Sequence, residues 1–569
     1  RPDMAETAEP TSTAMLFERN DALVVEAFRR GEFDYLEGAG EVSETDFFRA
    51  MTERKVLQKL ADTYPSPHKK HDVPVWVYLA SDISMRFHGV HRFHAFPYVV
   101  RSGGMIQAFG PAMGHKVMHP QTGDVSLCCE GFNDKNDYDR QTPCDQDYLR
   151  KMARQTDAQA LQSWFNREVV GIFKQHHAFD SEGIFIGDGT YLFVPDNSNY
   201  QGSSVLLFDE HNHPVESQDL TAQQRARCVL RRCYKLVSLI HTNRAGEFFL
   251  YAGVEVTAGK DHENPILYRL VEQFIECHGR GILKRLIVDR GFIDGPEIGR
   301  CKQEWGVDVL IPARSNMDIY QDVVSLAASG ELCFQPWEPP ALHPKPMALH
   351  RPERIRKREQ ARQKTLALRK AKAQHRLPTP DPSKTRVRCE VATVAGLKTF
   401  STCPVPLNAI VNREIYADGH HDYWVLLDTA PVNDPTRGRQ DYALRTAIEE
   451  RHRQLKCFSD LEAFSSRAFS LIVNQVVFVL LTYSLLQWYL VRAARKQLNA
   501  KTRTRILELL RPSTTVILIY YQNYVACLSP LKHQELVLTL NEQARKKILA
   551  KTRRLRRNLA HQLDHARPP

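Results

Sequence analysis

Residues 183–312 constrain the fold most, because short β-rich runs are followed there by an alternation of helix and strand. The runs rich in β-branched and aromatic residues predict strands at 184–194, 234–242 and 248–256. The segment that follows predicts, in order, a helix near 265–277, a strand at 283–288, a helix near 295–305 and a strand at 307–312. Residues 200–219 predict an extra hairpin or loop between the first two strands. Three consecutive strands followed by alternating helix and strand predict an α/β domain.

A second informative segment is 442–456, YALRTAIEERHRQLK, which contains no Pro or Gly and predicts a helix. Its apolar residues form one stripe that suits a core, namely Leu444, Ile448 and Leu455. A separate arc, about sixty degrees wide, carries a phenol, two cations and a carboxylate, namely Tyr442, Arg445, Glu449 and Lys456. Such an arc can place a carboxylate at a metal while its cations hold a phosphate backbone. A solvated, salt-bridged helix face is the alternative interpretation.

Two aspartates lie at the ends of strongly apolar runs, Asp188 in GIFIGDGT and Asp289 in LIVDRGF. A carboxylate in that setting is costly to desolvate unless a positive charge compensates it. One such aspartate could be a strand-end or turn residue. Two of them in one sheet, with Glu449 on a following helix, predict a shared divalent-cation site. We assign Glu449 rather than Glu450, because Glu450 projects about 100° away on the helix.

The spacing Tyr-x2-Arg-x3-Glu-x6-Lys, together with the DGT and DRGF contexts, resembles the signature of the IS4-type family of DDE transposases. The resemblance covers residues 180–490 approximately. It implies an RNase H-like α/β catalytic core with a large insertion domain, and the terminal regions are predicted to be mainly helical. It also implies an enzyme that cleaves DNA at transposon ends and transfers the strands to a target, by cut-and-paste transposition.

The resemblance further implies the roles of individual residues. Asp188, Asp289 and Glu449 would be the catalytic residues and would hold two Mg²⁺ ions, for which Mn²⁺ can substitute, because hard oxygen ligands suit these metals. Tyr442, Arg445 and Lys456 would fix the DNA backbone. Trp424, which precedes the catalytic helix, is a candidate for stacking on a flipped base, and a core tryptophan is the alternative.

The charge of the chain is unevenly distributed. The net charge is +11, but residues 343–388 hold 15 Lys/Arg against three Asp/Glu, and residues 501–569 hold 14 against four. Two basic segments beside a more acidic remainder suit a protein that binds phosphate. The basic segment 352–375 predicts a DNA-contacting helix, with a solvated linker helix as the alternative. Its candidate DNA-binding residues are Arg354, Arg356, Lys357 and Arg358.

We divide the chain into five predicted regions. These are an N-terminal, DNA-end-binding region (1–180), the first part of the core (181–314), a basic and β-rich insertion (315–430), the second part of the core with the catalytic helix (431–495) and a basic C-terminal helical region (496–569). In the last region a leucine-rich spacing, Leu536, Leu538, Leu540 and Ile548, predicts a face that could pack against a partner.

The expected partners are double-stranded DNA, comprising transposon terminal inverted repeats and target DNA, and a second copy of the chain in a homodimer. Twelve cysteines without a framework spacing favour a reduced, intracellular protein. The resemblance implies a cytoplasmic, nucleoid-associated one. The membrane-like stretch 470–490 is interrupted by polar residues and predicts a buried core helix. Two other functions stay open: a non-catalytic, transposase-derived DNA-binding protein and a metal-dependent nuclease without strand transfer.

Overall fold

The computed structural model describes most of the chain and divides it into two compact units. The described residues are 18–40, 43–69, 73–87, 91–96, 115–118, 125–128, 145–338, 351–374, 381–458, 460–496, 499, 515–522 and 524–565. Unit 1 comprises residues 1–172, 199–201 and 458–569, and unit 2 comprises residues 173–198 and 202–457. The chain therefore changes unit after Cys457, inside the region 431–495 that the sequence predicts as one core segment.

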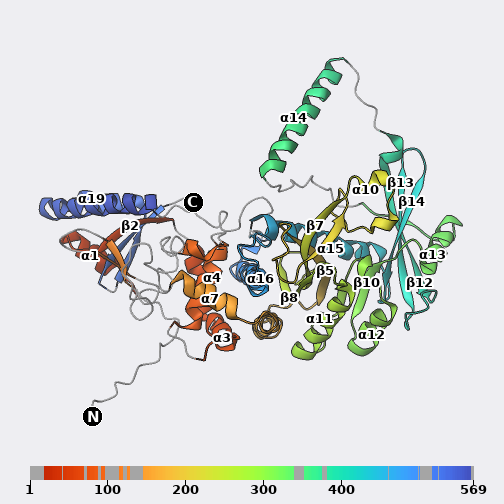
Figure 1. Ribbon diagram of the computed structural model, residues 1–569, viewed down its shortest axis with the longest axis horizontal. Coiled ribbons are helices and arrows are strands. Elements are labelled where there is room, and N and C mark those ends of the chain that lie inside the picture. The colour runs from red at the N-terminus through yellow and green to blue at the C-terminus, as the bar shows by residue number, and fades with distance from the viewer. Residues whose placement is uncertain are drawn as a thin grey trace, which may run out of the picture. The chain divides into compact units, whose positions relative to one another are not determined.

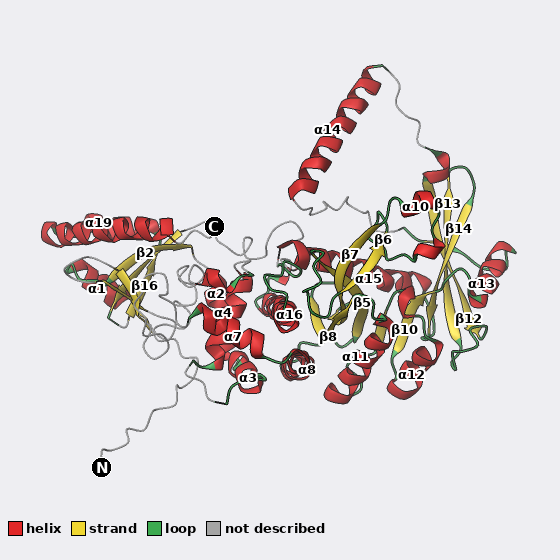
Figure 2. Ribbon diagram, viewed as in Figure 1, coloured by secondary structure: helices red, strands yellow, loops and turns green. Residues whose placement is uncertain are grey.

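Unit 2 is built on a ten-stranded mixed sheet (Figure 2). Its strand order is β11-β12-β13-β14-β10-β9-β5-β7-β6, with β8 paired to β7. The strands are β5 (Ile184–Val194), β6 (Ser204–Phe208), β7 (Val229–Thr242), β8 (Phe249–Ala258), β9 (Arg285–Ile287), β10 (Asp308–Pro312), β11 (Gln335–Pro336), β12 (Arg386–Leu397), β13 (Leu407–Tyr416) and β14 (His421–Asp428). The central strands β5, β9 and β10 are parallel neighbours, and β10 pairs antiparallel with β14. A mixed α/β fold, as predicted, is confirmed.

Helices lie on both faces of this sheet. The helices described in unit 2 are α10 (Ala222–Arg225), α11 (Glu263–His278), α12 (Gly295–Trp305), α13 (Asp318–Ala328), α14 (Arg351–Ala373) and α15 (Pro435–Phe458). Figure 1 shows α11 and α12 next to each other along the sheet. Gly187 of β5 faces α11, because a Cβ there would lie 2.4 Å from Leu267. The next residue, Asp188, contacts α15 instead. Since side chains alternate along a strand, α11 and α15 lie on opposite faces of β5.

Unit 1 contains a helical group and a separate small sheet. The helical group consists of α2 (Ser43–Glu53), α3 (Val56–Thr63), α4 (Val75–Phe87), α7 (Gln146–Gln155), α8 (Ala158–Trp164), the first residues of α9 (Val170–Gln175) and α16 (Phe469–Arg492). By length and composition α16 could cross a membrane, but 83% of its most apolar window is buried. The prediction of a buried core helix at 470–490 is therefore confirmed.

The small sheet joins the two ends of the chain, in the order β1-β16-β15-β2. Its strands are β1 (Glu18–Arg19), β2 (Tyr35–Gly40), β15 (Thr515–Tyr521) and β16 (Tyr524–Leu528), and the neighbouring helices are α1 (Asp21–Arg29), α18 (Pro530–Thr539) and α19 (Glu542–His565). The prediction of mainly helical terminal regions omitted this sheet. Leu536, Leu540 and Ile548 are buried within the chain, and Leu538 is exposed. The predicted leucine-rich face therefore packs on its own chain rather than forming a continuous partner surface.

Candidate active site

Two strands bring the predicted aspartates to the same end of the sheet. β5 and β9 are parallel and pair Ile186 with Ile287, so Asp188 and Asp289 each follow this pair by two residues. Asp188 is 4% exposed. Asp289 lies beyond the end of β9, and its Oδ1 accepts from the Gly291 backbone N–H at 2.7 Å. The two carboxylates therefore lie on adjacent strands. The prediction of an aspartate at each strand end is wrong for Asp188, because β5 continues past it to Val194 in antiparallel pairing with β7.

Helix α15 brings a cation and a third carboxylate to this pair. Arg445 Nη2 donates to Asp289 Oδ2 (2.9 Å) and to Asp188 Oδ1 (3.3 Å), and Nη1 donates to Glu449 Oε1. Burial lowers the pKa of the Arg445 guanidinium, but the charges of Asp188, Glu449 and Asp289 raise it by more, so Arg445 stays charged. Glu450, by contrast, is buried and pairs with Arg453 on its own helix. One guanidinium thus joins the three predicted metal ligands.

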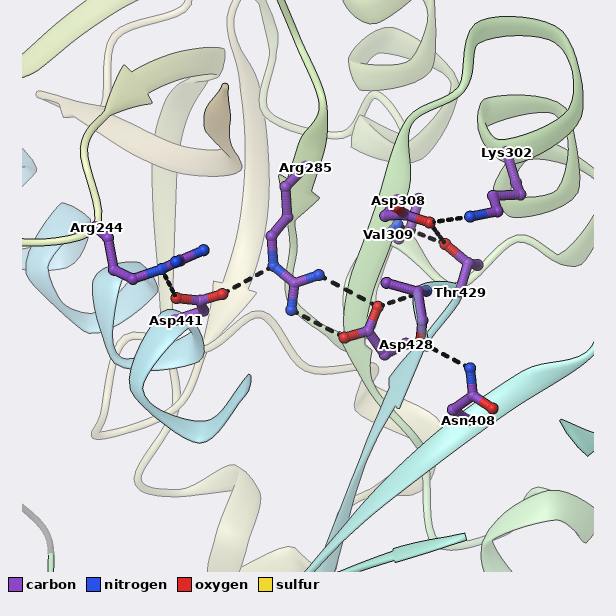
Figure 3. Close-up of polar contacts among 10 residues, drawn as sticks. Arg244, Arg285, Lys302, Asp308, Val309, Asn408, Asp428, Thr429 and Asp441 are labelled. Atoms are coloured by element: carbon purple, nitrogen blue, oxygen red, sulfur yellow. Dashed lines mark hydrogen bonds and ion pairs between the residues drawn. The ribbon is translucent and has the colours of Figure 1, made fainter. Parts of the chain in front are cut away.

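The position of α15 is set by packing and by a buried charge network. Leu444, Ile448 and Leu455 are buried, which confirms the predicted apolar stripe. Asp441, also on α15, forms ion pairs with Arg244 Nε (2.9 Å) and Arg285 Nε (3.0 Å), as Figure 3 shows.

The network continues across the sheet through Arg285 of β9. Arg285 Nη2 donates to Asp428 Oδ2 of β14 at 2.9 Å. Burial lowers the pKa of Arg285, and the charges of Asp428 and Asp441 raise it by more. Because β9 leads directly to Asp289, the network ties α15 to the strand that carries one of the site's carboxylates.

We expect Asp441→Asn to lower the free energy of unfolding by about 1–3 kcal/mol, because it weakens the hydrogen bond from Arg244 and the ion pair with Arg285 at a buried carboxylate. Asp441 is 2% exposed, so solvent cannot replace the lost carboxylate. Denaturant unfolding of Asp441→Asn and of the exposed control Asp322→Asn measures the difference. The control should stay within about 0.5 kcal/mol of the unchanged protein. Equal stability of both variants would show that the network does not anchor α15.

Two residues near the site were not predicted from the sequence. His452 of α15 is 3% exposed, and its Nδ1 lies 3.1 Å from Asp188 Oδ2. Its Nε2 has no hydrogen-bond partner among the described residues. The helical projection carried a signal for it, since residue 452 falls at about 280°, beside Arg445 at about 300°.

The second unpredicted residue is Glu263, the first residue of α11. A Cβ at Gly291 would lie 3.0 Å from Glu263 Oε1 and 2.9 Å from Asp289 Oδ1, so the glycine leaves open the space between these carboxylates. Lys235 Nζ lies 3.8 Å from Glu263 Oε2. Burial raises the pKa of Glu263, Lys235 opposes this, and the charges of Asp289 and Asp188 raise it further. Nothing in the sequence around Glu263 indicates this proximity.

The remaining predicted residues with described side chains lie on α15 or beside it. Lys456 Nζ donates to the Tyr191 carbonyl of β5. The Tyr442 ring lies 6.1 Å from the Trp424 ring, and burial raises the pKa of the Tyr442 phenol. The Arg439 guanidinium lies over Trp424, 4.4 Å from the ring centroid. Trp424 is therefore packed against side chains of α15. For the basic helix α14, the side chains of Arg354, Arg356, Lys357 and Arg358 lie outside the described residues.

The side chains at the site fit a divalent metal by their chemistry. Among the described residues no group of three His, Cys, Asp or Glu side chains is arranged around a metal position. The cation amid the carboxylates is the Arg445 guanidinium. The oxygen donors of Asp188, Asp289 and Glu449 are the hard ligands that Mg²⁺ and Mn²⁺ prefer. Gly291 keeps the adjacent space free of a side chain.

The fold and the site thus define a mixed α/β protein with carboxylates gathered from one strand, the segment after a neighbouring strand and one helix. Residues 200–485, half of the chain, match the family model of the transposase DDE domain, and the chain belongs to that family. The matched region includes Asp289 and Glu449 and begins after Asp188. Among curated proteins none matches the chain. Membership of this family makes the chain a transposase, which binds DNA, and DDE transposase domains generally use divalent metals.

Proposed function

We propose that the chain is an IS4-type transposase that cleaves DNA at transposon ends and joins the ends to target DNA, in cut-and-paste transposition. The observation that carries the proposal is the convergence of Asp188, Asp289 and Glu449 on one guanidinium, from β5, β9 and α15. The strand order around β5, β7, β8, β9 and β10 supports an RNase H-like core, with residues 315–430 as its insertion.

In this proposal Asp188, Asp289 and Glu449 hold two Mg²⁺ ions, for which Mn²⁺ can substitute. When bound, such ions activate the attacking oxygen and stabilise the leaving oxygen of an in-line displacement at phosphorus. The side chains of the chain orient the reactants. His452 fixes the carboxylate of Asp188, and Arg445 and Lys456 hold the DNA phosphates close to the carboxylates. Tyr442 and Trp424 form an aromatic edge beside them, on which a flipped base could stack.

We propose a further DNA contact at the basic helix α14, on the basis of its charge. Helix α14 carries ten Lys/Arg and two Glu among its 23 residues and is exposed from Glu359 to Arg369. Its arginines and lysines would contact DNA without reading its sequence. Two ends must be held together during transposition, so we propose a homodimer in the DNA complex, working in the bacterial or archaeal cytoplasm.

The function is tested with duplex DNA that carries the inverted repeats flanking the coding region, incubated with Mg²⁺ and a target plasmid. Cleavage followed by joining supports the proposed transposase. Cleavage without joining would favour a metal-dependent nuclease, and binding without cleavage would favour a non-catalytic DNA-binding protein. Sequencing of the joined products reports whether both ends enter the target.

Glu263 is expected to contribute to metal binding in the proposed site, because it lies next to Asp289 across the space left by Gly291. Glu263→Gln keeps the shape but removes the charge, and we expect the affinity for Mn²⁺ to fall by roughly 10-fold to 100-fold. Calorimetric titration of the DNA-free protein with Mn²⁺ measures this without relying on activity. Glu276→Gln, exposed on the same helix, is the matched control. If both variants bind Mn²⁺ equally well, Glu263 has no part in the site.

A further inference from the structure

A basic cavity lies within unit 1, apart from the carboxylate site of unit 2. Its volume is about 550 Å³, and it is lined by the end of α4, residues 91–94, α7, residues 464–466 and the first turns of α16. Six of its lining residues are cationic or can become so, namely Arg86, His91, Arg92, His94, Arg150 and Arg154. The acidic residue among the lining residues is Asp147. The cavity thus has an excess of positive charge.

The innermost of these cations is Arg86, whose side chain is 3% exposed. Its Nε donates to Asp82 Oδ1 at 2.9 Å, and both side chains belong to α4. Its Nη1, however, has no hydrogen-bond partner among the described residues. This donor is enclosed by protein, so an anion in the cavity reaches it only if the Arg86 side chain shifts toward the cavity; such a shift would satisfy a buried donor that is otherwise costly.

The rim of the cavity carries further arginines that are exposed. Arg92 and Arg154 form no ion pair with any acidic side chain that the structure describes. Arg150 Nη2 lies 3.2 Å from Asp147 Oδ1, a pair that solvent screens. The rim is held in place, because His91 Nδ1 lies 3.3 Å from Asp460 Oδ2 and the His91 carbonyl accepts from Ser465 Oγ at 3.3 Å. The segment that carries Arg92 is therefore held in place, and Arg154 is carried by α7.

We propose that this cavity holds a phosphodiester unit of duplex DNA, bound by Arg86 at its base and by Arg92 and Arg154 at its rim. Guanidinium groups present paired N–H donors that match phosphate oxygens. Several arginines around one cavity repel a metal ion and favour an anion. The choice of DNA as the source of the phosphate rests on the proposed function. The apolar wall formed by Phe93, Phe464 and Leu471 gives the sugar a surface to pack against.

The proposal is tested by the salt dependence of DNA binding by the full chain, in EDTA, with the inverted-repeat duplex as the probe. Each phosphate contact contributes about 0.9 to the slope of log K against log salt. Arg92→Gln and Arg154→Gln should each flatten the slope, by at most about that amount, because they share one phosphate. Lys151→Gln is the matched control, because Lys151 is an exposed cation on the same helix as Arg154 but does not line the cavity. Its slope should equal that of the unchanged protein.

If the slope of log K against log salt were the same for Arg154→Gln and Lys151→Gln, the proposal would be overturned. This holds whether that common slope equals the slope of the unchanged protein or differs from it. Thermal unfolding of each variant checks that the fold is intact; these rim residues are exposed, so the test avoids disturbing the buried Arg86–Asp82 pair. The outcome is separable from that of the proposed function. If the rim variants have flatter slopes than the Lys151→Gln control but the protein does not cleave DNA, transposition is rejected and the phosphate site is retained. Cleavage with equal slopes would retain transposition and reject the site.

Discussion

Asp188→Asn, Asp289→Asn and Glu449→Gln are each expected to lower the rate of DNA cleavage by more than about 100-fold while leaving DNA binding in place. Loss of a group that merely supports a metal ligand already costs 10-fold to 100-fold in affinity or activity, so loss of a ligand should cost more. Each amide preserves the size of the side chain and removes one negative charge from the cluster around Arg445. DNA affinity should not fall, because removing a carboxylate reduces repulsion of the phosphates.

The measurement is single-turnover cleavage of the inverted-repeat duplex with Mg²⁺, with binding followed separately by fluorescence anisotropy. Glu450→Gln is the matched control, because Glu450 adjoins Glu449 on α15 but pairs with Arg453. It should cleave DNA. Wild-type cleavage by any of the three variants would remove that residue from the proposed ligands, and an inactive Glu450→Gln beside an active Glu449→Gln would transfer the role to Glu450.

Local patterns were sufficient to predict the elements that carry this site. The run 184–194 predicts β5 with its observed bounds, because its β-branched and aromatic residues favour a strand. The period of Leu444, Ile448 and Leu455 predicts the buried stripe of α15. The same projection places Arg445 and Glu449 on one arc, and in the structure they form an ion pair. These features depend on residues a few positions apart, which a single sequence displays directly.

Features that depend on distant pairing were not predictable in this way. Glu263 reaches Asp289 only because α11 packs against β5 and against the turn Arg290–Phe292, and no local pattern records that packing. β15 carries the local strand signal VILIYY, which the prediction of a helical C-terminus overlooked. Its pairing with β2, in the register Ile519 to Leu36, joins residues at opposite ends of the chain. The sequence therefore shows that a strand is there but not which strand it joins.

Arg445→Gln is expected to lower the free energy of unfolding by about 3–5 kcal/mol in EDTA, which is the usual cost of removing one partner from a buried ion pair. The Asp188 side chain is 5% exposed and would lose the cation that lies 3.3 Å from its Oδ1. His452 would remain as its neighbour. Asp289 and Glu449 are more exposed, so water can compensate them in part. The stability loss should therefore come mainly from Asp188.

Addition of Mn²⁺ should restore more stability to Arg445→Gln than it gives to the unchanged protein. In the proposed site a divalent ion would bind the three carboxylates that Arg445 contacts, so the guanidinium would compete with the metal in the unchanged protein and would be absent in the variant. A ligand that binds the folded state stabilises it by RT ln(1 + [L]/Kd), so the tighter site gains more at equal Mn²⁺ concentration. Thermal unfolding of both proteins, with and without Mn²⁺, gives the two gains directly.

Arg453→Gln separates this competition from a general effect of losing an arginine on α15. Arg453 pairs with Glu450 rather than with the three carboxylates, so its loss should lower stability without changing the gain from Mn²⁺. If Arg445→Gln were as stable as the unchanged protein in EDTA, Arg445 would not be the counter-ion of Asp188. If the gain from Mn²⁺ were the same in all three proteins, the metal would bind somewhere other than the carboxylates that Arg445 joins. A larger gain in Arg445→Gln alone would place the metal among those carboxylates, and Arg445 would have to move before the metal binds.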